Sequence, residues 1–256
     1  MDSLPAERKA LLFSAGGVRL AMRVSHLREV VAVPPDEGEV RVRGETVATA
    51  FVSTVLGLPA GAAPYAILTQ GTPPAALRVE ALHGIVDLAE AEVFQLPART
   101  CLPQPPPFSA AVVTKGDIAL ELAVGSLGFA PIEPVDEQGE PPADVEPPPE
   151  RELRFARGGR TFGVPLSLLV QVLEAPRVAA VPLTPPSHRG LLYPGRALHP
   201  VLDVAVLYGD APSAVQTVLL LDAGGSGVAV AADRVIGVGE LGEGVVRPPW
   251  DAVFVA

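Results

Sequence analysis

The chain contains the stretch Leu11-Leu12-Phe13-Ser14-Ala15-Gly16-Gly17 and, 142 residues later, the stretch Leu153-Arg154-Phe155-Ala156-Arg157-Gly158-Gly159. The two stretches share a Leu, a Phe and a Gly pair at the same places. An alternating strand follows each Gly pair, and Ser25 or Ser167 then opens a run that we expect to form a short helix. A repeat of about 100 residues or more is too long for one turn of a solenoid. The spacing therefore predicts a duplicated domain.

A proline-rich acidic segment separates the two copies. Ile132–Glu150 holds seven acidic residues and no Lys or Arg, together with the prolines of Pro141-Pro142 and Pro147-Pro148-Pro149. Like charges repel and proline removes backbone donors, so we expect an extended, semi-rigid linker. A ligand for a proline-recognition domain is the alternative. The predicted organisation is domain 1–131, linker 132–150 and domain 151–256.

The composition excludes several kinds of partner. Of 256 residues, 48% are apolar and 19% charged, and no apolar run approaches the roughly 18 residues of a membrane span. The net charge is −10, and without the acidic linker the remainder is close to neutral. A nucleic acid or an anionic membrane would require a basic stripe that is missing. A single cysteine, Cys101, and a start without a signal core are typical of a cytoplasmic protein.

Short strands broken by Gly and Pro predict a mainly β fold, made of barrels or sandwiches. Two further runs, Val52–Leu56 and Val204–Tyr208, have a helical pattern of one or two turns. The predicted strands are Tyr65–Leu68, Ala76–Val79, Ile118–Leu122, Val218–Leu221 and Val228–Ala231.

No motif for catalysis or cofactor binding is convincing. Gly237, Gly239 and Gly242 have the spacing of a dinucleotide fingerprint, but Gly244 and two prolines follow where that motif needs a helix. The four histidines have neither metalloprotease spacing nor a cysteine companion for zinc. We therefore predict a protein that is not an enzyme and has no cofactor or metal.

The order of several weaker motifs resembles one known family. The second half contains Gly190-Leu191-Leu192, Gly195-Arg196, Pro200-Val201-Leu202-Asp203 and Ala232-Asp233-Arg234-Val235, and the first half contains Arg43-Gly44. Together they resemble the CheW-like domain of bacterial chemosensory systems, twice over. The resemblance implies that each copy is a pair of small SH3-like β-barrels with one or two short helices.

The resemblance also implies a function, which is adaptor binding between a histidine kinase and receptors. We expect bivalent docking on a kinase regulatory domain and on a chemoreceptor tip or another CheW-like protein, at a signalling array. The family's contact positions correspond here to Leu27, Glu29, Arg43, Gly44, Leu169, Gln171, Gly195, Arg196 and Asp203.

Departures from the family pattern indicate that the copies have diverged. Copy one has Phe51 and Ala48 where the pattern has Asp and Pro, and its stretch from Glu29 to Arg43 is about ten residues shorter than in copy two. Copy two ends without a counterpart of Ile118–Leu127, so we expect its last strand to be missing or supplied by something else, and an unpaired edge there would invite a partner strand.

Some residues and the function as a whole keep alternative interpretations. Asp203 and Asp233 could hold turns, and Leu27 and Leu169 could be core residues rather than contacts. Trp250 could anchor a partner or fold back onto its own barrel. One alternative function is a scaffold of a motility or polarity complex without receptor binding. A more remote one is a small-ligand-binding or hydrolytic β-barrel protein.

Overall fold

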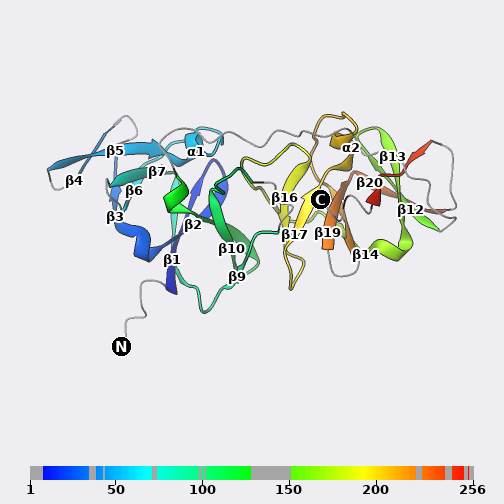
Figure 1. The fold of residues 1–256 in the computed structure, drawn as a ribbon, viewed down its shortest axis with the longest axis horizontal. Helices are drawn as coiled ribbons and strands as arrows, with labels where there is room; N and C mark the ends of the chain where they lie inside the picture. The colour runs from blue at the N-terminus through cyan, green and yellow to red at the C-terminus, as the bar shows by residue number, and fades with distance from the viewer. Residues whose placement is uncertain are drawn as a thin grey trace. The chain divides into compact units, whose positions relative to one another are not determined.

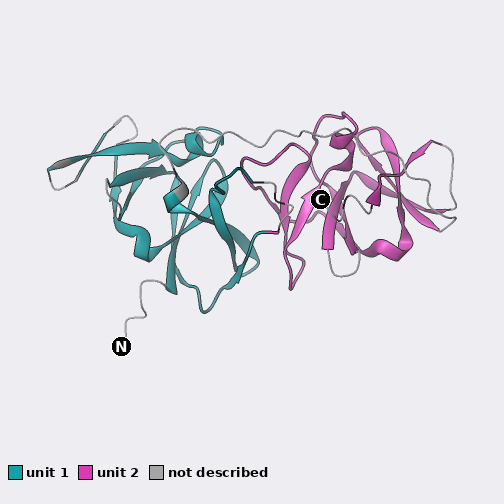
Figure 2. Ribbon diagram, viewed as in Figure 1, with its two compact units in different colours: residues 1–96, 102–135 teal, residues 97–101, 136–256 magenta. Residues whose placement is uncertain are grey.

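The chain divides into two compact units, each built from two β-sheets. Unit 1 comprises Met1–Leu96 and Leu102–Val135, and unit 2 comprises Pro97–Cys101 and Asp136–Ala256 (Figure 2). The structure is a computed structural model that describes residues 8–34, 39–42, 44–70, 74–97, 100, 102–127, 151–222, 227–239, 244–250 and 253. The predicted linker 132–150 lies outside these residues, so its form and the proposed domain boundaries stay predictions.

Unit 1 contains eleven described strands in two sheets (Figure 1). The first sheet consists of β1 (Lys9–Ala15), β2 (Val18–Arg23), β8 (Ala81–Asp87), β9 (Glu92–Phe94), β10 (Phe108–Thr114) and β11 (Asp117–Leu122), in the order β8-β1-β2-β11-β10-β9. The second consists of β3 (Leu27–Ala32), β4 (Val40–Val42), β5 (Glu45–Phe51), β6 (Tyr65–Thr69) and β7 (Ala75–Val79), in the order β3-β6-β7-β5-β4.

Unit 2 repeats this arrangement with a shorter first sheet. Its first sheet consists of β12 (Glu152–Arg157), β13 (Arg160–Pro165), β20 (Arg234–Gly239) and β21 (Val245–Val246), in the order β20-β12-β13-β21. Its second consists of β14 (Leu169–Glu174), β15 (Val178–Ala179), β16 (His188–Leu192), β17 (His199–Leu202), β18 (Thr217–Asp222) and β19 (Gly227–Ala232), in the order β14-β18-β19-β17-β16-β15. The mainly β prediction is confirmed, and the curled sheet pairs are consistent with SH3-like barrels.

The five strands predicted from the sequence are all present as β6, β7, β11, β18 and β19, and both short helices are α1 (Val52–Val55) and α2 (Val204–Leu207). The helical runs predicted after Ser25 and Ser167 are wrong. A single 3-10 turn is followed in each case by a strand, β3 or β14. Valines fill both runs, and their branched side chains favour a pleated strand over a helix.

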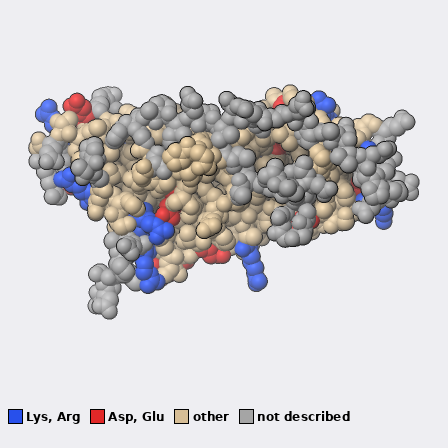
Figure 3. Space-filling model, in the orientation of Figure 1, with Lys and Arg blue, Asp and Glu red and all other residues tan. Residues whose placement is uncertain are grey.

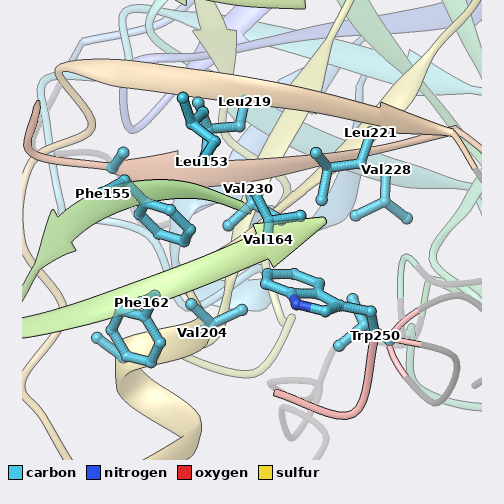
Figure 4. Packing of buried hydrophobic residues seen from close by; sticks show 13 residues of the cluster. Leu153, Phe155, Phe162, Val164, Val204, Leu219, Leu221, Val228, Val230 and Trp250 are labelled. Atoms are coloured by element: carbon cyan, nitrogen blue, oxygen red, sulfur yellow. The ribbon is translucent and has the colours of Figure 1, made fainter. Parts of the chain in front are cut away.

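The core of unit 2 illustrates how alternation places side chains. Leu153 and Phe155 of β12 point inward, and Phe155 stacks on Phe162 of β13 with ring centroids 5.6 Å apart. Trp250 joins this cluster from the end of the chain (Figure 4), and its Nε1 donates a hydrogen bond to the Gly163 carbonyl at 3.0 Å. The tail thus folds back onto its own barrel.

The two expected departures between the copies have clear structural counterparts. In unit 2 the longer loop before the Gly195 turn carries β15, which pairs with β16 and has no counterpart among the described strands of unit 1. At the end of unit 2, β21 pairs in parallel with β13 as β11 pairs with β2. The two-residue strand β21 therefore occupies the place of the strand that we expected to be missing. In the order of strands across the sheet, no counterparts of β10 and β9 lie beyond β21 among the described residues.

Candidate functional site

The most buried charged group of unit 2 is the guanidinium of Arg157, the last residue of β12. Its Nε donates to Asp203 Oδ1 at 3.0 Å, and Nη2 also contacts Asp203. Its Nη1 donates to Asp233 Oδ1 at 2.7 Å. Arg157 and Asp203 are 0% and 1% exposed, whereas the Asp233 side chain is partly exposed. We call these three residues the Arg157 cluster.

The Arg157 cluster ties together segments that are distant in sequence. The remaining guanidinium N–H groups donate to the carbonyls of Ser213 and Ala214 at 2.9 Å each, so all five donors have partners. Asp233 also accepts from the Gly158 amide at 3.0 Å. Burial alone would lower the pKa of Arg157, but the hydrogen bonds and charges of Asp203 and Asp233 raise it above its ordinary value. A guanidinium committed in this way is structural and offers no general acid or base.

Unit 1 fastens the same loop with a different arginine. Ala15 and Phe51 stand at the places of Arg157 and Asp203, and the buried guanidinium belongs to Arg78 of β7. Arg78 donates to the Ala63 carbonyl at 2.9 and 2.7 Å and stands 5.2 Å from the Phe51 ring centroid. In both units, a buried guanidinium thus holds the loop that follows the short helix. The strand that carries the buried arginine differs between the copies, β7 in unit 1 and β12 in unit 2, as expected if the copies have diverged.

The family resemblance placed Asp203 among the partner contacts, and in the structure its side chain belongs to the Arg157 cluster. Its carboxylate is buried against Arg157, and its backbone amide donates to the Ser187 carbonyl at 2.7 Å. The alternative role, holding local structure, describes it correctly, and the same applies to Asp233 at the turn before β20.

The other predicted contact residues are distributed over edge strands and turns. Leu27 and Glu29 lie on β3, and Leu169 and Gln171 lie on β14, each strand being at the edge of its sheet. Leu169 is half-buried and packs against the unit 2 core, whereas Gln171 is exposed. The remaining positions are in the turns before β5 and β17: Gly44, Gly195 and Arg196 are exposed, and Arg43 lies outside the described residues.

The structure does not bring these residues together through strand pairing. In unit 2, β14 is at one end of the strand order, and β16 and β17, which flank the Gly195 turn, are towards the other end. In unit 1, β3 and β4 are likewise the two ends of the second sheet. Strand pairing therefore does not join the two groups of predicted contacts in either unit.

Sequence reasoning missed the exposed apolar side chains on two edge strands of unit 2. On β20, Ile236 is 50% exposed and Val238 is 46% exposed, with Val235 beside them. On β14, Val170 is 60% exposed and Val172 is also exposed. We call these the β20 edge and the β14 edge. The signal was present, because consecutive apolar residues in a strand must place some of them on the outer face.

Among the described residues, unit 1 has fewer exposed large apolar side chains, namely Ile85 of β8 and Val93 of β9. On β8, the counterpart of β20, the positions of Ile236 and Gly237 are occupied by His83 and Gly84, and Ile85 is the exposed large apolar residue. Pairing shows the equivalence, because Ile85 lies opposite Leu11 as Val238 lies opposite Leu153. Exposed apolar groups of this kind mark interaction surfaces when they gather.

A buried histidine lies on β16, just before the Gly195 turn. His188 is buried, and neither of its ring nitrogens has a hydrogen-bond partner among the described residues. Burial disfavours the charged imidazolium and lowers the pKa of His188 from 6.5 to about 4. The folded state of unit 2 therefore holds this imidazole neutral across the physiological range.

Unit 2 is expected to lose stability as the pH falls from about 6.5 to about 4, because the unfolded chain binds a proton at His188 that the folded chain rejects. The stabilisation is fully present above pH 6.5, and its loss amounts to ~3 kcal/mol by pH 4. Urea unfolding monitored by Trp250 fluorescence measures it. The variant His188→Leu should remove this part of the pH dependence, and an unchanged pH profile would contradict the assignment to His188.

Other kinds of site have no support in the described part of the chain. There, no group of three or more His, Cys, Asp or Glu side chains is placed to hold a metal ion. None of the helices described is long and apolar enough to cross a membrane. On the face drawn in Figure 3, charged side chains stand in separate small groups between uncharged areas.

Comparison with known proteins agrees with the architecture of unit 2. The protein-family model described as "CheW-like domain" matches residues 152–254. Among solved structures, the crystal structure of the scaffolding protein TtCheW from Thermoanaerobacter tengcongensis is similar. It has 16% sequence identity and a TM-score of 0.38, and the match covers 45% of this chain and 88% of that chain. A search of curated proteins found no match.

Proposed function

We propose that the chain is a non-catalytic signalling adaptor that couples a chemosensory histidine kinase to receptors or to other CheW-like proteins. The observation that carries this proposal is the β20 edge, an exposed apolar strand on the unit that matches the CheW-like domain. CheW-like domains are a family of scaffold modules, and exposed apolar side chains on an edge strand suit protein docking better than chemistry.

In this proposal the two units have different tasks. Unit 2 provides the main docking surface through the β20 edge and the β14 edge, with Gln171, Gly195 and Arg196 as further contacts. Unit 1 is a diverged second CheW-like domain, and its exposed Gly44 turn and β3 supply a weaker surface. Binding by both units to one assembly would raise the apparent affinity through effective concentration, by ~10²-fold or more.

The test compares two substitutions at equivalent positions of the full chain. Val238→Glu places a charge on the β20 edge, and Ile85→Glu places the same charge at the matching position of β8. Both side chains are exposed, so neither change should unfold its unit. In a titration against the regulatory domain of a histidine kinase from the same genome, Val238→Glu should weaken binding at least ~10-fold.

Ile85→Glu is the matched control and should change the affinity less than about threefold. Equal weakening by both variants would contradict the assignment of the main surface to unit 2. If the unmodified chain does not bind the kinase domain at all, the adaptor proposal is wrong, and a scaffold without a kinase partner replaces it.

A further inference from the structure

Each unit closes its first sheet with an ion pair at the same place, and the two pairs have opposite polarity. In unit 1, Arg23 at the end of β2 binds Glu121 of β11, with Nε to Oε1 at 2.6 Å and Nη2 to Oε2 at 3.3 Å. In unit 2, Arg247 after β21 binds Glu152 of β12, with Nε to Oε2 at 3.0 Å and Nη2 to Oε1 at 3.1 Å. Both contacts are bidentate, the strongest geometry for this pair of groups.

The strand registers show that these positions correspond. Leu120 of β11 pairs with Leu20 of β2, and Val246 of β21 pairs with Phe162 at the equivalent place of β13. Glu121 and Arg247 are the next residues, so an acid on the closing strand of unit 1 stands where unit 2 has a base. We use the term closing strand for β11 in unit 1 and for Val245–Arg247 in unit 2.

The groups that receive the closing strands are also at one place. In the first hairpin of unit 1, Ala10 pairs with Arg23, and in that of unit 2, Glu152 pairs with Pro165. The open end of the hairpin thus carries a base in unit 1 and an acid in unit 2. The charged residue of the hairpin lies on the second strand, β2, in unit 1 and on the first strand, β12, in unit 2. Its sign is opposite in the two units, as is the sign of its partner on the closing strand.

Both carboxylates are buried, so each needs a cationic partner to compensate for its lost hydration. Glu121 is 5% exposed and Glu152 is 3% exposed. Glu152 Oε1 also accepts a hydrogen bond from Arg154 Nε at 3.3 Å. A side chain at Gly163 would not fit, because its Cβ would lie 2.4 Å from Glu152 Oε2. The hairpin of unit 2 is therefore shaped around this carboxylate, and a closing strand without a base would leave it short of its bidentate partner.

We propose that the opposite polarity is a recognition code that opposes exchange of closing strands between unit 1 and unit 2, within one chain and between copies of the chain, so that each hairpin accepts only a closing strand of its own unit type. The closing strand of unit 1 on the hairpin of unit 2 would bring Glu121 against Glu152. The reverse exchange would bring Arg247 against Arg23. Tandem copies of one domain are prone to exchange of equivalent strands, and like charges oppose it, most strongly where the two buried glutamates would meet.

The experiment reverses the code in one unit of the full chain. The double variant Glu152→Arg with Arg247→Glu keeps an internal ion pair in unit 2 but gives it the polarity of unit 1. After refolding from urea at high protein concentration, we expect the fraction of dimer, measured by light scattering, to rise at least ~10-fold above that of the unmodified chain. The emission of Trp250, the single tryptophan, reports in parallel whether the tail of unit 2 docks on its own barrel.

A fourfold variant supplies the decisive control. Adding Arg23→Glu with Glu121→Arg reverses unit 1 as well, so the two polarities are again opposite and clean refolding to monomer should return. The unit 1 double variant alone is the second route to matched polarities, and it serves if the unit 2 variant does not fold. If the matched variants refold with the same monomer yield and Trp250 emission as the unmodified chain, polarity does not select the closing strand and the proposal is overturned.

Discussion

Replacing Asp203 by alanine is expected to lower the free energy of unfolding of unit 2 by ~3–5 kcal/mol. The change removes the carboxylate that takes Nε and Nη2 of Arg157, while the guanidinium stays buried. Asp233 remains, but its side chain is partly exposed and reaches only Nη1. A buried cation that has lost its main partner cannot recover its hydration without opening the structure. Urea unfolding followed by Trp250 fluorescence reports this loss specifically for unit 2.

The matched control removes both members of the buried pair. Arg157→Met with Asp203→Leu replaces charges by apolar groups of similar size, a change that is often neutral or stabilising in buried pairs. We therefore expect the double variant to be more stable than Asp203→Ala. If Asp203→Ala loses less than ~1 kcal/mol, the carboxylate does not neutralise Arg157 in the way that the geometry indicates.

The position of Arg157 could be predicted from the sequence, but not its partners. Leu153 and Phe155 alternate inward on β12, so the same period places Arg157 inward as well. Its partners, Asp203 and Asp233, come from residues 46 and 76 positions away, and local patterns carry no information about such distant pairing. The repeat stretch Leu153–Gly159 contains Arg157, but its sequence did not indicate that Arg157 forms a buried cluster.

Local patterns predicted strands well where turn residues bounded them, and less well where a strand followed a serine. β6, β7, β18 and β19 are bounded by changes of composition that the sequence shows. The runs after Ser25 and Ser167 combine a helical start with valines, and pairing decided the outcome. β3 pairs with β6 and β14 pairs with β18, each across a bulge near its start, and these tertiary contacts override a weak helical preference.

The candidate contacts depend more on resemblance than on pattern, and they stay predictions. Gln171, Gly195 and Arg196 are exposed, whereas Asp203 is buried. The apolar residues of the β20 edge follow directly after Asp233 in the sequence, but exposure depends on which strand ends a sheet. Strand order is a property of the whole fold, so the edge position of β20 could not be predicted from its own residues.

Replacing Trp250 by alanine is expected to lower the free energy of unfolding of unit 2 by ~3–5 kcal/mol. Trp250 is 7% exposed, belongs to the main core cluster of unit 2, and lies beyond a closing strand only two residues long. In unit 1 the six residues of β11, backed by β10 and β9, complete the first sheet. The indole is the largest side chain that the tail of unit 2 adds to the core, so its removal leaves a cavity there.

The conservative variant Trp250→Phe separates packing from hydrogen bonding. It keeps most of the apolar contact but loses the bond from Nε1 to the Gly163 carbonyl, so we expect a smaller loss of ~1–2 kcal/mol. Calorimetry of the full chain measures both variants, because each removes the tryptophan probe. Equal losses for alanine and phenylalanine would show that the hydrogen bond, not the packing, holds the tail. Negligible losses for both would show that unit 2 is closed without its tail, and the two-residue β21 would then suffice.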